Sequence, residues 1–426
     1  MRITSSEISP TKVEKLANNA TLVSQHMGDR KTVSIAFAVK VGSAYEKDDN
    51  SGISHFVEHT VFKGTKTRST FDIKEPIERV GGTLNAYTGR VATVYFAQMP
   101  VTHIDDALEI LYDLVLNPSF NEQAVQLEKQ VVLEEISEAE DDPLDYIYDM
   151  TIRKIWDKNY GRPVLGTRKT VEGFSKDQIS EFHNQMYSSN KMIFAITGNY
   201  SNEVLEKIKN MLSCIQGSSS SNNNIMGKIK EDPVYFSEVK QDLKQTHILL
   251  SKPGPGRNNE EDFEAFRVFN VFFGSGMSSI LFHNIREKQG MVYNIHSEYV
   301  AYRDFGSFFI NASTNPRNLG KLLNSIRREL LRLKENGIKS SELNYGKERL
   351  KGKLMLSTES TLATISRHID EMITTGYPSS IEELLENIDS LNVNEVNEVI
   401  NRYLTGKWNV SILSSKENGG TISFEL

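Results

Sequence analysis

Two histidines and a glutamate lie within five consecutive residues, and this spacing strongly constrains how the chain can fold. The segment SHFVEHT, residues 54–60, reads His-x-x-Glu-His, the mirror order of the His-Glu-x-x-His zinc motif. On a helix, residues four apart share a face, so His55 and His59 can bind one metal ion together. Glu58 can reach a water on that metal, which suits a general base better than a third ligand. The alternative is a surface helix with two solvated histidines.

Length and composition limit the class of protein. A chain of 426 residues favours two domains of about 200 residues each. The net charge of −7 argues against a nucleic-acid-binding protein, which needs a basic face. The single cysteine, Cys214, excludes an internal disulfide and fits a reducing compartment. No secretory signal and no apolar run of about 18 residues is visible, so we expect a cytoplasmic protein without membrane insertion.

The residues around the motif predict alternating strands and helices. β-branched runs predict strands over 21–25 and 33–41, and the motif helix should follow over 52–62. A pair of strands is expected over 83–88 and 91–99. Helical periodicity and capping signals predict further helices over 102–115, 121–139, 143–156 and 175–187, and a buried strand over 192–197. This element order indicates an α+β domain.

A catalytic zinc usually keeps three protein ligands and one open position, so His55 and His59 need a partner from elsewhere in the chain. Two carboxylates on the acidic helix over 121–139 stand out. Glu128 and Glu135 are seven residues apart and therefore lie two turns apart on one helical face. The other interpretation of Glu128 is an ordinary exposed helix carboxylate.

The second half of the chain repeats the first faintly. The matched segments are 61–65 with 271–275, 121–136 with 341–356, and 178–196 with 395–413, at offsets of 210, 220 and 217 residues. At the first offset the three motif residues fall on Ala265, Val268 and Phe269, which cannot bind a metal. The repeat therefore predicts two similarly folded domains, the second without metal-binding side chains.

A polar linker separates the two halves. The sequence from Gly217 onwards reads GSSSSNNN and has no apolar periodicity. We therefore predict a metal-binding domain over 1–216, a linker over 217–227 and a related domain over 228–426.

Four segments together resemble one family. They are SHFVEHTVFKGT, GGTLNAYT, LEKQVVLEEI and FFGSGMSSILFHNIREKQGMVY. In this order and spacing they resemble the pitrilysin and insulinase-type zinc metallopeptidases with an inverted motif, specifically the short, two-domain members similar to mitochondrial processing peptidase. Two departures from that pattern occur: Thr60 and Val61 stand where a methionine is common, and Asn159 stands where a histidine often precedes Gly-Arg-Pro.

The resemblance implies a fold and a set of site residues. It implies two similar α+β domains, each a mostly antiparallel sheet with helices packed on one face. One zinc ion per chain would be held by His55, His59 and Glu135, with Glu58 activating a zinc-bound water as the nucleophile. The remaining implied residues are Glu128, which would orient a zinc-binding histidine, and the substrate-binding residues Asn85, Ala86, Arg286 and Tyr293. For the last two, a helix-end arginine and a core tyrosine are the alternative.

The implied activity is that of a zinc endopeptidase acting on oligopeptides or extended, unfolded segments. Longer relatives build the site from the first and fourth of four domains, so the resemblance implies a homodimer in which Arg286 and Tyr293 of one chain complete the site of the other. One alternative is a non-catalytic or partner-dependent subunit of a processing-peptidase-like complex. Another is a metal-dependent hydrolase that acts on a different class of substrate.

Overall fold

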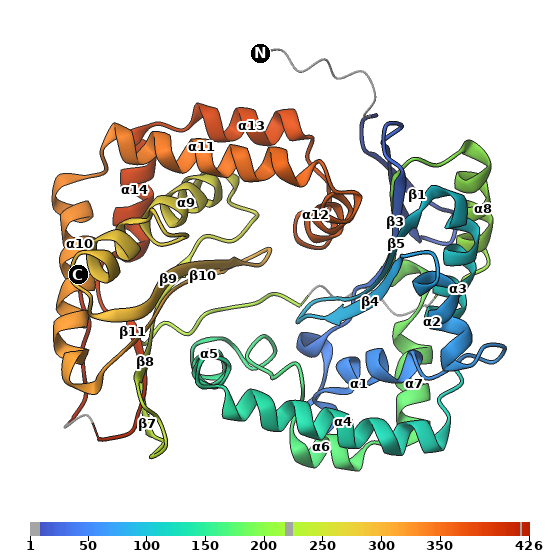
Figure 1. Cartoon of the computed structure of the whole chain (residues 1–426), viewed down its shortest axis with the longest axis horizontal. Coiled ribbons are helices and arrows are strands. Elements are labelled where there is room, and N and C mark those ends of the chain that lie inside the picture. The colour runs from blue at the N-terminus through green and yellow to red at the C-terminus, as the bar shows by residue number, and fades with distance from the viewer. Residues whose placement is uncertain (1–8, 218–224, 418–419) are drawn as a thin grey trace. The chain divides into compact units, whose positions relative to one another are not determined.

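The structure, a computed structural model, describes residues 9–217, 225–417 and 420–426. These residues group into two compact units (Figure 1). Unit 1 comprises Met1–Glu138, Arg162–Ile225 and Leu356–Ser380, and unit 2 comprises Ala139–Gly161, Met226–Met355 and Ile381–Leu426. Each unit contains one β-sheet with helices packed against it, which confirms the predicted α+β class and the two similar domains.

The sheet of unit 1 is mixed but mostly antiparallel. Its strands are β1 (Lys12–Lys15), β2 (Thr21–His26), β3 (Thr32–Val39), β4 (Thr83–Thr88), β5 (Thr93–Pro100) and β6 (Met192–Gly198). They lie in the order β1-β2-β6-β3-β5-β4, and only the β2–β6 pair is parallel among the described strands of this sheet. The strand β4 is therefore an edge strand, with one side of its backbone not paired to another strand of this sheet.

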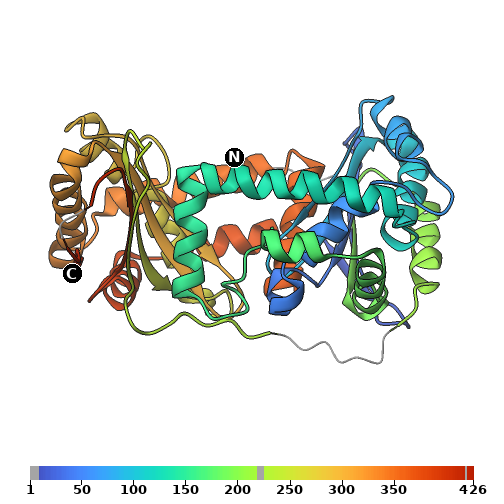
Figure 2. The same ribbon diagram turned by 90° about the horizontal axis from the view of Figure 1, so that it is seen from below.

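The helices of unit 1 cover both faces of this sheet. They are α1 (Ile53–Val61), α2 (Thr70–Glu78), α3 (Ile104–Leu116), α4 (Glu122–Asp141, up to Glu138 in this unit), α6 (Arg168–Gly173), α7 (Lys176–Met186), α8 (Asn202–Ser213) and α12 (Thr361–Thr374). Alternate residues of β3 such as Ile35 and Phe37 pack against α1, α3 and α7, with α3 and α8 on one side of the sheet in Figures 1 and 2. On the opposite face, Ala36 and Ala38 pack against Ile365 of α12.

Unit 2 repeats this topology. Its strands are β7 (Tyr235–Val239), β8 (Thr246–Gly254), β9 (Val292–Ala301), β10 (Gly306–Thr314) and β11 (Asn409–Ser414). They lie in the order β7-β11-β8-β10-β9, with β7 and β11 parallel and the other pairs antiparallel. The helices are α5 (Pro143–Ile155), α9 (Glu260–Phe273), α10 (Leu319–Asn336), α11 (Ser340–Ser357, up to Met355 in this unit), α13 (Ile381–Ser390) and α14 (Val393–Leu404). Strand order and direction thus agree with the predicted repeat.

Short helical turns connect these elements. The 3₁₀ turns are Ser43–Tyr45, Asp48–Asn50, Val101–His103, Ser189–Lys191 and Pro316–Asn318, and a π-helical segment covers Phe282–Glu287. The described helices include none that combines the length and the apolar character needed to cross a membrane.

The units differ from the linear division expected from the sequence. Helix α5 lies in the first half of the chain but packs on β8 and β11 of unit 2, where Thr151 donates to Ser411 at 2.7 Å. Helix α12 lies in the second half but packs on β3 and β6 of unit 1. The domains predicted over 1–216 and 228–426 therefore exchange one helix each, and each exchanged helix covers the sheet face opposite the main helical layer. Residues 218–224 of the predicted linker lie outside the described residues.

Candidate metal centre

Helix α1 carries the motif residues, and buried polar groups fix the start of this helix. The Glu46 carboxylate, which is 4% exposed, accepts hydrogen bonds from the Gly52 N–H at 2.7 Å and the Ser54 N–H at 2.9 Å. The first amides of a helix have no partner within the helix, so an anion at this position satisfies them and interacts favourably with the helix dipole. Burial raises the pKa of Glu46, although these amides and Arg162 act in the opposite direction.

A close backbone approach also fixes where α1 begins. Gly52 has a φ of 91° at the N-terminal cap, and a Cβ there would lie 2.6 Å from the Cα of Gly166. Only glycine combines this left-handed conformation with such close packing. The apolar side of α1, which includes Phe56 and Val57, is buried in the core of unit 1. The histidine side of the helix is consequently held in one orientation.

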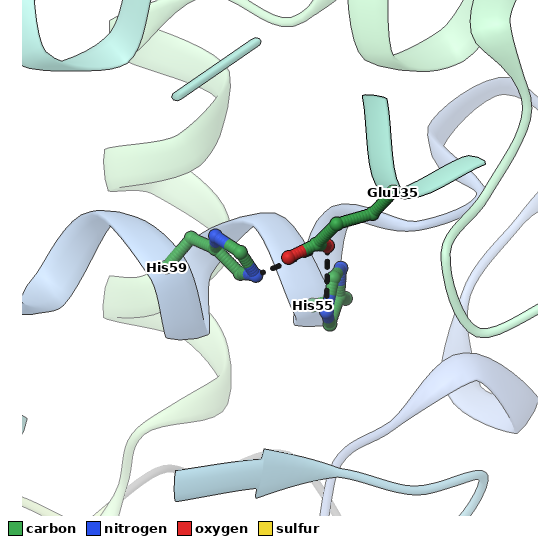
Figure 3. A group of neighbouring side chains, drawn as sticks. All are labelled: His55, His59 and Glu135. Carbon is green, nitrogen blue, oxygen red and sulfur yellow. Dashed lines mark ion pairs between the residues drawn. The ribbon is translucent and has the colours of Figure 1, made fainter. Parts of the chain in front are cut away.

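Helix α4 brings Glu135 to the two histidines, as Figure 3 shows. Its Oε2 lies 3.4 Å from His59 Nε2 and 3.8 Å from His55 Nε2. One potential ligand atom from each of the three residues lies within 4.8 Å of the others. These three residues form the predicted group, although Glu135 follows His59 by 76 residues along the chain.

The chemistry of this group fits a zinc ion. Ligand atoms of one tetrahedral zinc lie about 3.4 Å apart, since each is about 2.1 Å from the metal. The Nε2 atoms of both histidines face Glu135, whose Oε2 is buried and makes no hydrogen bond within the described residues. Two imidazoles and one carboxylate form a known ligand set of catalytic zinc sites, which leaves a fourth position open.

Glu128 contacts one of these histidines. Its Oε2 lies 3.1 Å from His59 Nδ1 and its Oε1 lies 2.6 Å from Lys63 Nζ. Burial raises the pKa of Glu128, but the hydrogen bonds from His59 and Lys63 outweigh burial, so that the net pKa lies below its usual value. With Nδ1 paired to a carboxylate, the Nε2 of His59 is left to face a metal. The alternative of an exposed surface carboxylate is wrong, since Glu128 is 3% exposed.

The two histidines have opposite electrostatic environments. Burial, together with the nearby charge of His59, lowers the pKa of His55 to about 3. For His59, burial lowers the pKa, but the hydrogen bond to Glu128 and the charges of Glu135 and Glu58 raise it above its usual value. The two ring centroids lie 4.5 Å apart, so a positive charge on both rings at the same time is disfavoured. A neutral His55 is the form that binds a metal.

Glu58 lies on the same helix and is held by a residue of the neighbouring edge strand. The Thr88 hydroxyl donates to Glu58 Oε2 at 2.6 Å. Burial raises the pKa of Glu58, and this hydrogen bond and the charge of His59 lower it by less. A raised pKa makes the Glu58 carboxylate a stronger proton acceptor than an exposed glutamate, which suits a general base.

The edge strand β4 contains Asn85 and Ala86, which the resemblance assigns to substrate binding. The Gly89 N–H donates to Ala92 O at 2.8 Å, so Gly89 and Ala92 are a hydrogen-bonded pair at the end of the hairpin. From there, non-hydrogen-bonded and hydrogen-bonded residue pairs alternate along β4 and β5. Ala86 and Thr88 fall on pairs whose backbone groups point away from β5, towards the free edge. The Ala86 N–H donates to the Asn85 side chain at 2.8 Å. An incoming acceptor could therefore replace the Asn85 side chain as the partner of this N–H.

Arg286 and Tyr293 come together within unit 2. Arg286 lies in the π-helical segment and Tyr293 on the edge strand β9, where Tyr293 is 75% exposed. The Arg286 guanidinium carbon lies 5.4 Å from the Tyr293 ring centre and 4.5 Å from that of Phe282. The alternative of a core tyrosine is wrong, because the ring is exposed. Their role in substrate binding stays a prediction.

Among the described residues, the group in unit 1 is the one set of three metal-ligating side chains close enough to hold an ion. The equivalent helix of unit 2, α9, presents Ala265, Val268 and Phe269, which are 0–1% exposed. The repeat thus places apolar core residues where unit 1 has the motif.

Three residues that shape the site were not assigned from the sequence. Lys63 was noted only as part of a motif, although it follows His59 by four residues and could have been expected on the same face. Thr88 ends the segment GGTLNAYT. Because it follows Ala86 by two residues on an expected strand, both side chains could have been expected on the same face of the sheet. Glu46 gives no local signal, because it caps α1 from a preceding turn.

Comparison with known proteins identifies the family of the chain. Residues 21–168 match the family Insulinase (Peptidase family M16), and residues 173–350 match the Peptidase M16 inactive domain. The chain is 31% identical to an uncharacterised zinc protease of Bacillus subtilis, YmxG, over 94% of this chain and 97% of that protein. It is 32% identical to an uncharacterised zinc protease of Rickettsia bellii over 96% of this chain and 98% of that protein.

Solved structures have the same fold. A protease from Helicobacter pylori superposes with a TM-score of 0.88 at 21% identity, over 95% of this chain and 99% of that one. A peptidase M16 inactive domain from Pseudomonas fluorescens superposes with a TM-score of 0.87 at 18% identity, over 96% and 98%. With its two matched family regions, its relatives of about the same length and its topology, the chain belongs to the insulinase family of peptidases, family M16.

Proposed function

We propose that the protein is a zinc-dependent endopeptidase that hydrolyses peptide bonds in oligopeptides or extended, unfolded segments. The observation that carries the proposal is the group of His55, His59 and Glu135 with Glu58 on the same helix. Membership of the insulinase family and the name zinc protease of two relatives support it. One zinc ion per chain is proposed, held by these three ligands.

Each residue of the site has a role that follows from its position. Zinc, when bound, supplies a Lewis acid that polarises the scissile carbonyl and lowers the pKa of a water. Glu58 takes a proton from the attacking water and passes it to the leaving amine. Thr88 donates to that carboxylate. Glu128 holds the Nδ1 of His59 and thereby keeps its Nε2 directed at the metal.

The proposed substrate is an extended peptide that adds to the edge of the sheet at β4. Backbone groups of Ala86 face that free edge, so main-chain hydrogen bonds can form with little regard for sequence. Asn85, whose side chain accepts from the Ala86 amide, would exchange this bond for one with the peptide. Such pairing needs a substrate segment that is extended and whose own backbone groups are unpaired, as in an unfolded peptide.

We further propose that the chain acts as a homodimer in which Arg286 and Tyr293 of one copy hydrogen-bond the substrate in the other copy's site. The two side chains lie together in unit 2, where Tyr293 is exposed and Arg286 is half-buried. Mixing Glu58→Gln chains with Arg286→Ala chains tests this, because each supplies what the other lacks. Activity of the mixture above that of either variant supports completion by a second copy, and its absence contradicts it.

Hydrolysis of a quenched peptide tests the activity itself. We expect cleavage by the wild-type protein, loss on treatment with a chelator, recovery with added zinc, and a loss of about 10²–10⁴-fold in Glu58→Gln. The variant should still bind one zinc per chain, since Glu58 is not a ligand. A peptide-library digest read by mass spectrometry then gives the cleavage preference.

The same experiment separates the alternatives. Stoichiometric zinc without peptide hydrolysis would favour a non-catalytic subunit or a hydrolase of another substrate class. Peptide hydrolysis that survives Glu58→Gln would contradict the proposed mechanism.

A further inference from the structure

The hydrogen bond from Thr88 to Glu58 links the edge strand to the proposed general base. At 2.6 Å it has the length of a charge-assisted O–H···O bond to a carboxylate. Thr88 is the last residue of β4, and its side chain points to the face of the sheet on which α1 packs, as do those of Leu84 and Ala86. The bond therefore links α1 and β4, which are separated along the chain by α2.

The turn that follows Thr88 is held in place by several independent contacts. The Gly89 carbonyl accepts from the Ser43 N–H at 3.3 Å, and the Arg90 carbonyl accepts from the Ala44 N–H at 2.9 Å. Thr93, the cross-strand partner of Thr88, donates its hydroxyl to Val41 O at 3.0 Å. These bonds fix the position of the hairpin end.

A glycine in the facing loop makes the close approach possible. A Cβ on Gly42 would lie 2.2 Å from the Gly89 carbonyl oxygen, so any larger residue would push the turn away. The turn, and with it the Thr88 hydroxyl, thus has little freedom relative to α1. A donor fixed in this way restricts the rotamers open to the Glu58 carboxylate.

The backbone polar groups of Thr88 point away from β5. From the register of the hairpin, the N–H and C=O of Thr88 point to the free edge, as those of Ala86 do. The same residue therefore presents its backbone to the edge where the proposed substrate docks and its hydroxyl to the proposed base.

We propose that Thr88 is a positioning residue that holds Glu58 in its working orientation and couples docking of a peptide on β4 to that orientation. The inference rests on the proposed peptidase function. A peptide paired with the edge at Ala86 and Thr88 would restrain Thr88 further and so order Glu58 at the moment that substrate is present. Thr88 itself exchanges no proton with substrate.

Removal of the hydroxyl should affect turnover more than binding. In Thr88→Val the side chain keeps its shape but loses the donor, so Glu58 can leave its orientation. A displacement of about 1 Å in a catalytic group can reduce the rate by about 100-fold, and we expect kcat to fall about 10- to 100-fold with KM within about threefold. Thr88→Ser keeps the hydroxyl and should recover most of kcat.

A matched control lies on β6, outside the hairpin. Thr197→Val makes the same change at a buried hydroxyl that bonds the Thr361 carbonyl rather than Glu58. We expect this variant to lose stability but to keep kcat within about twofold, because its loss involves a single hydrogen bond away from the site. If Thr88→Val does not fold, Thr88→Ala removes the same donor with a smaller side chain.

A crystal structure of metal-free Thr88→Val gives a readout that does not depend on activity. We expect the Glu58 carboxylate to leave its wild-type rotamer while His55 and His59 stay in place. An unchanged Glu58 rotamer, an unchanged kcat, a higher KM with unchanged kcat, or an equal loss in Thr88→Ser would each overturn the role of Thr88. These results differ from failure of the proposed function, in which the wild-type protein does not cleave peptides or Glu58→Gln remains active.

Discussion

Unit 1 and unit 2 share a topology but differ in the helix that follows their first long strand. In unit 1 this helix is α1, whose half-buried side presents two histidines and a glutamate. In unit 2 it is α9, and most of its residues are buried, including Phe266, Phe269 and Phe272. The same position in the fold therefore serves a potential metal site in one unit and core packing in the other.

The comparison shows which part of each unit determines whether it can bind a metal. Apart from β1, which has no counterpart among the described strands of unit 2, the two sheets have the same strand order and pair directions. The arrangement of strands around α1 and α9 therefore does not distinguish the units. The difference lies in a few side chains on α1 and α4 and on their counterparts α9 and α11. Function follows from such a group of side chains rather than from the fold. Substitutions at equivalent positions of the two units are consequently the sharpest tests.

The largest difference is expected at the third ligand. Glu135→Gln should abolish stoichiometric zinc binding after dialysis and reduce peptide hydrolysis by about 10³-fold or more, since a metal contributes several kcal/mol to the transition state. Metal analysis and kcat/KM measure both effects. The equivalent residue at an offset of 220 is Met355, which is 42% exposed. Met355→Gln should change neither quantity, and a Glu135→Gln protein that retains zinc would remove Glu135 from the ligand set.

The second difference concerns stability at the position of His59, whose counterpart is Phe269. Phe269→Ala leaves a cavity among aromatic rings and should lower the free energy of unfolding by about 3–5 kcal/mol. In the metal-free protein, His59→Gln removes the hydrogen bond to Glu128 and should lower it by about 1 kcal/mol.

Each unit has its own natural probe for this measurement. Both tryptophans, Trp156 and Trp408, lie in unit 2, so their fluorescence reports the effect of Phe269→Ala in urea. The single cysteine, Cys214, is exposed and lies in unit 1, so a fluorophore on its thiol reports the effect of His59→Gln. Equal losses in the two units would contradict the division between a helix used for packing and a helix used for a site.

Much of this comparison could be predicted from the sequence. The motif spacing gave α1 within one residue at each end, and periodicity gave α3, α4 and α7. The ligand group could be named because His55 and His59 are local and Glu135 follows from a resemblance. The repeat at three offsets predicted that Ala265, Val268 and Phe269 replace the motif, and these residues are buried in unit 2.

The remainder depends on contacts that no local pattern encodes. Exchange of α5 and α12 between the units could not be predicted, because each helix has an ordinary amphipathic sequence and its partner sheet lies elsewhere in the chain. Similarly, Glu46 caps α1 from a separate turn. Strand β1, four exposed residues paired with β2, has no hydrophobic alternation and was not expected.

The third difference is a buried histidine in unit 1, His183, where the repeat places Ile400 in unit 2 at an offset of 217. His183 is 5% exposed, stacks on Tyr187, and its Nε2 lies 2.8 Å from Val115 O. Burial lowers its pKa to about 4, although the bond to Val115 acts in the opposite direction. Since an unfolded histidine has a pKa of about 6.5, the unfolded state binds more protons between these values, and stability falls as the pH falls from about 6.5 to 4.

Unit 1 should therefore lose on the order of 2–3 kcal/mol from this residue between pH 7 and pH 4.5. In His183→Gln this part of the pH dependence should disappear. Urea titrations followed by the fluorophore on Cys214 measure it, and tryptophan fluorescence of unit 2 serves as the internal control, because its profile should be the same in both proteins. An unchanged pH dependence of unit 1 in the variant would show that His183 titrates alike in the folded and unfolded states.

The smallest difference is expected at Glu128, whose counterpart is Glu348. The Glu128 side chain is 4% exposed and bonds His59 and Lys63, whereas that of Glu348 is 75% exposed and pairs only with Lys351 among the salt bridges of the described residues. Glu128→Gln keeps the shape but weakens the hold on His59, so zinc affinity should fall about 10- to 100-fold. Glu348→Gln should leave affinity unchanged, because exposed ion pairs contribute little. Competition with a chromogenic chelator measures both. Equal affinities in the two variants would mean that His59 is oriented by its helix alone, and the carboxylate behind it would then serve only to neutralise Lys63.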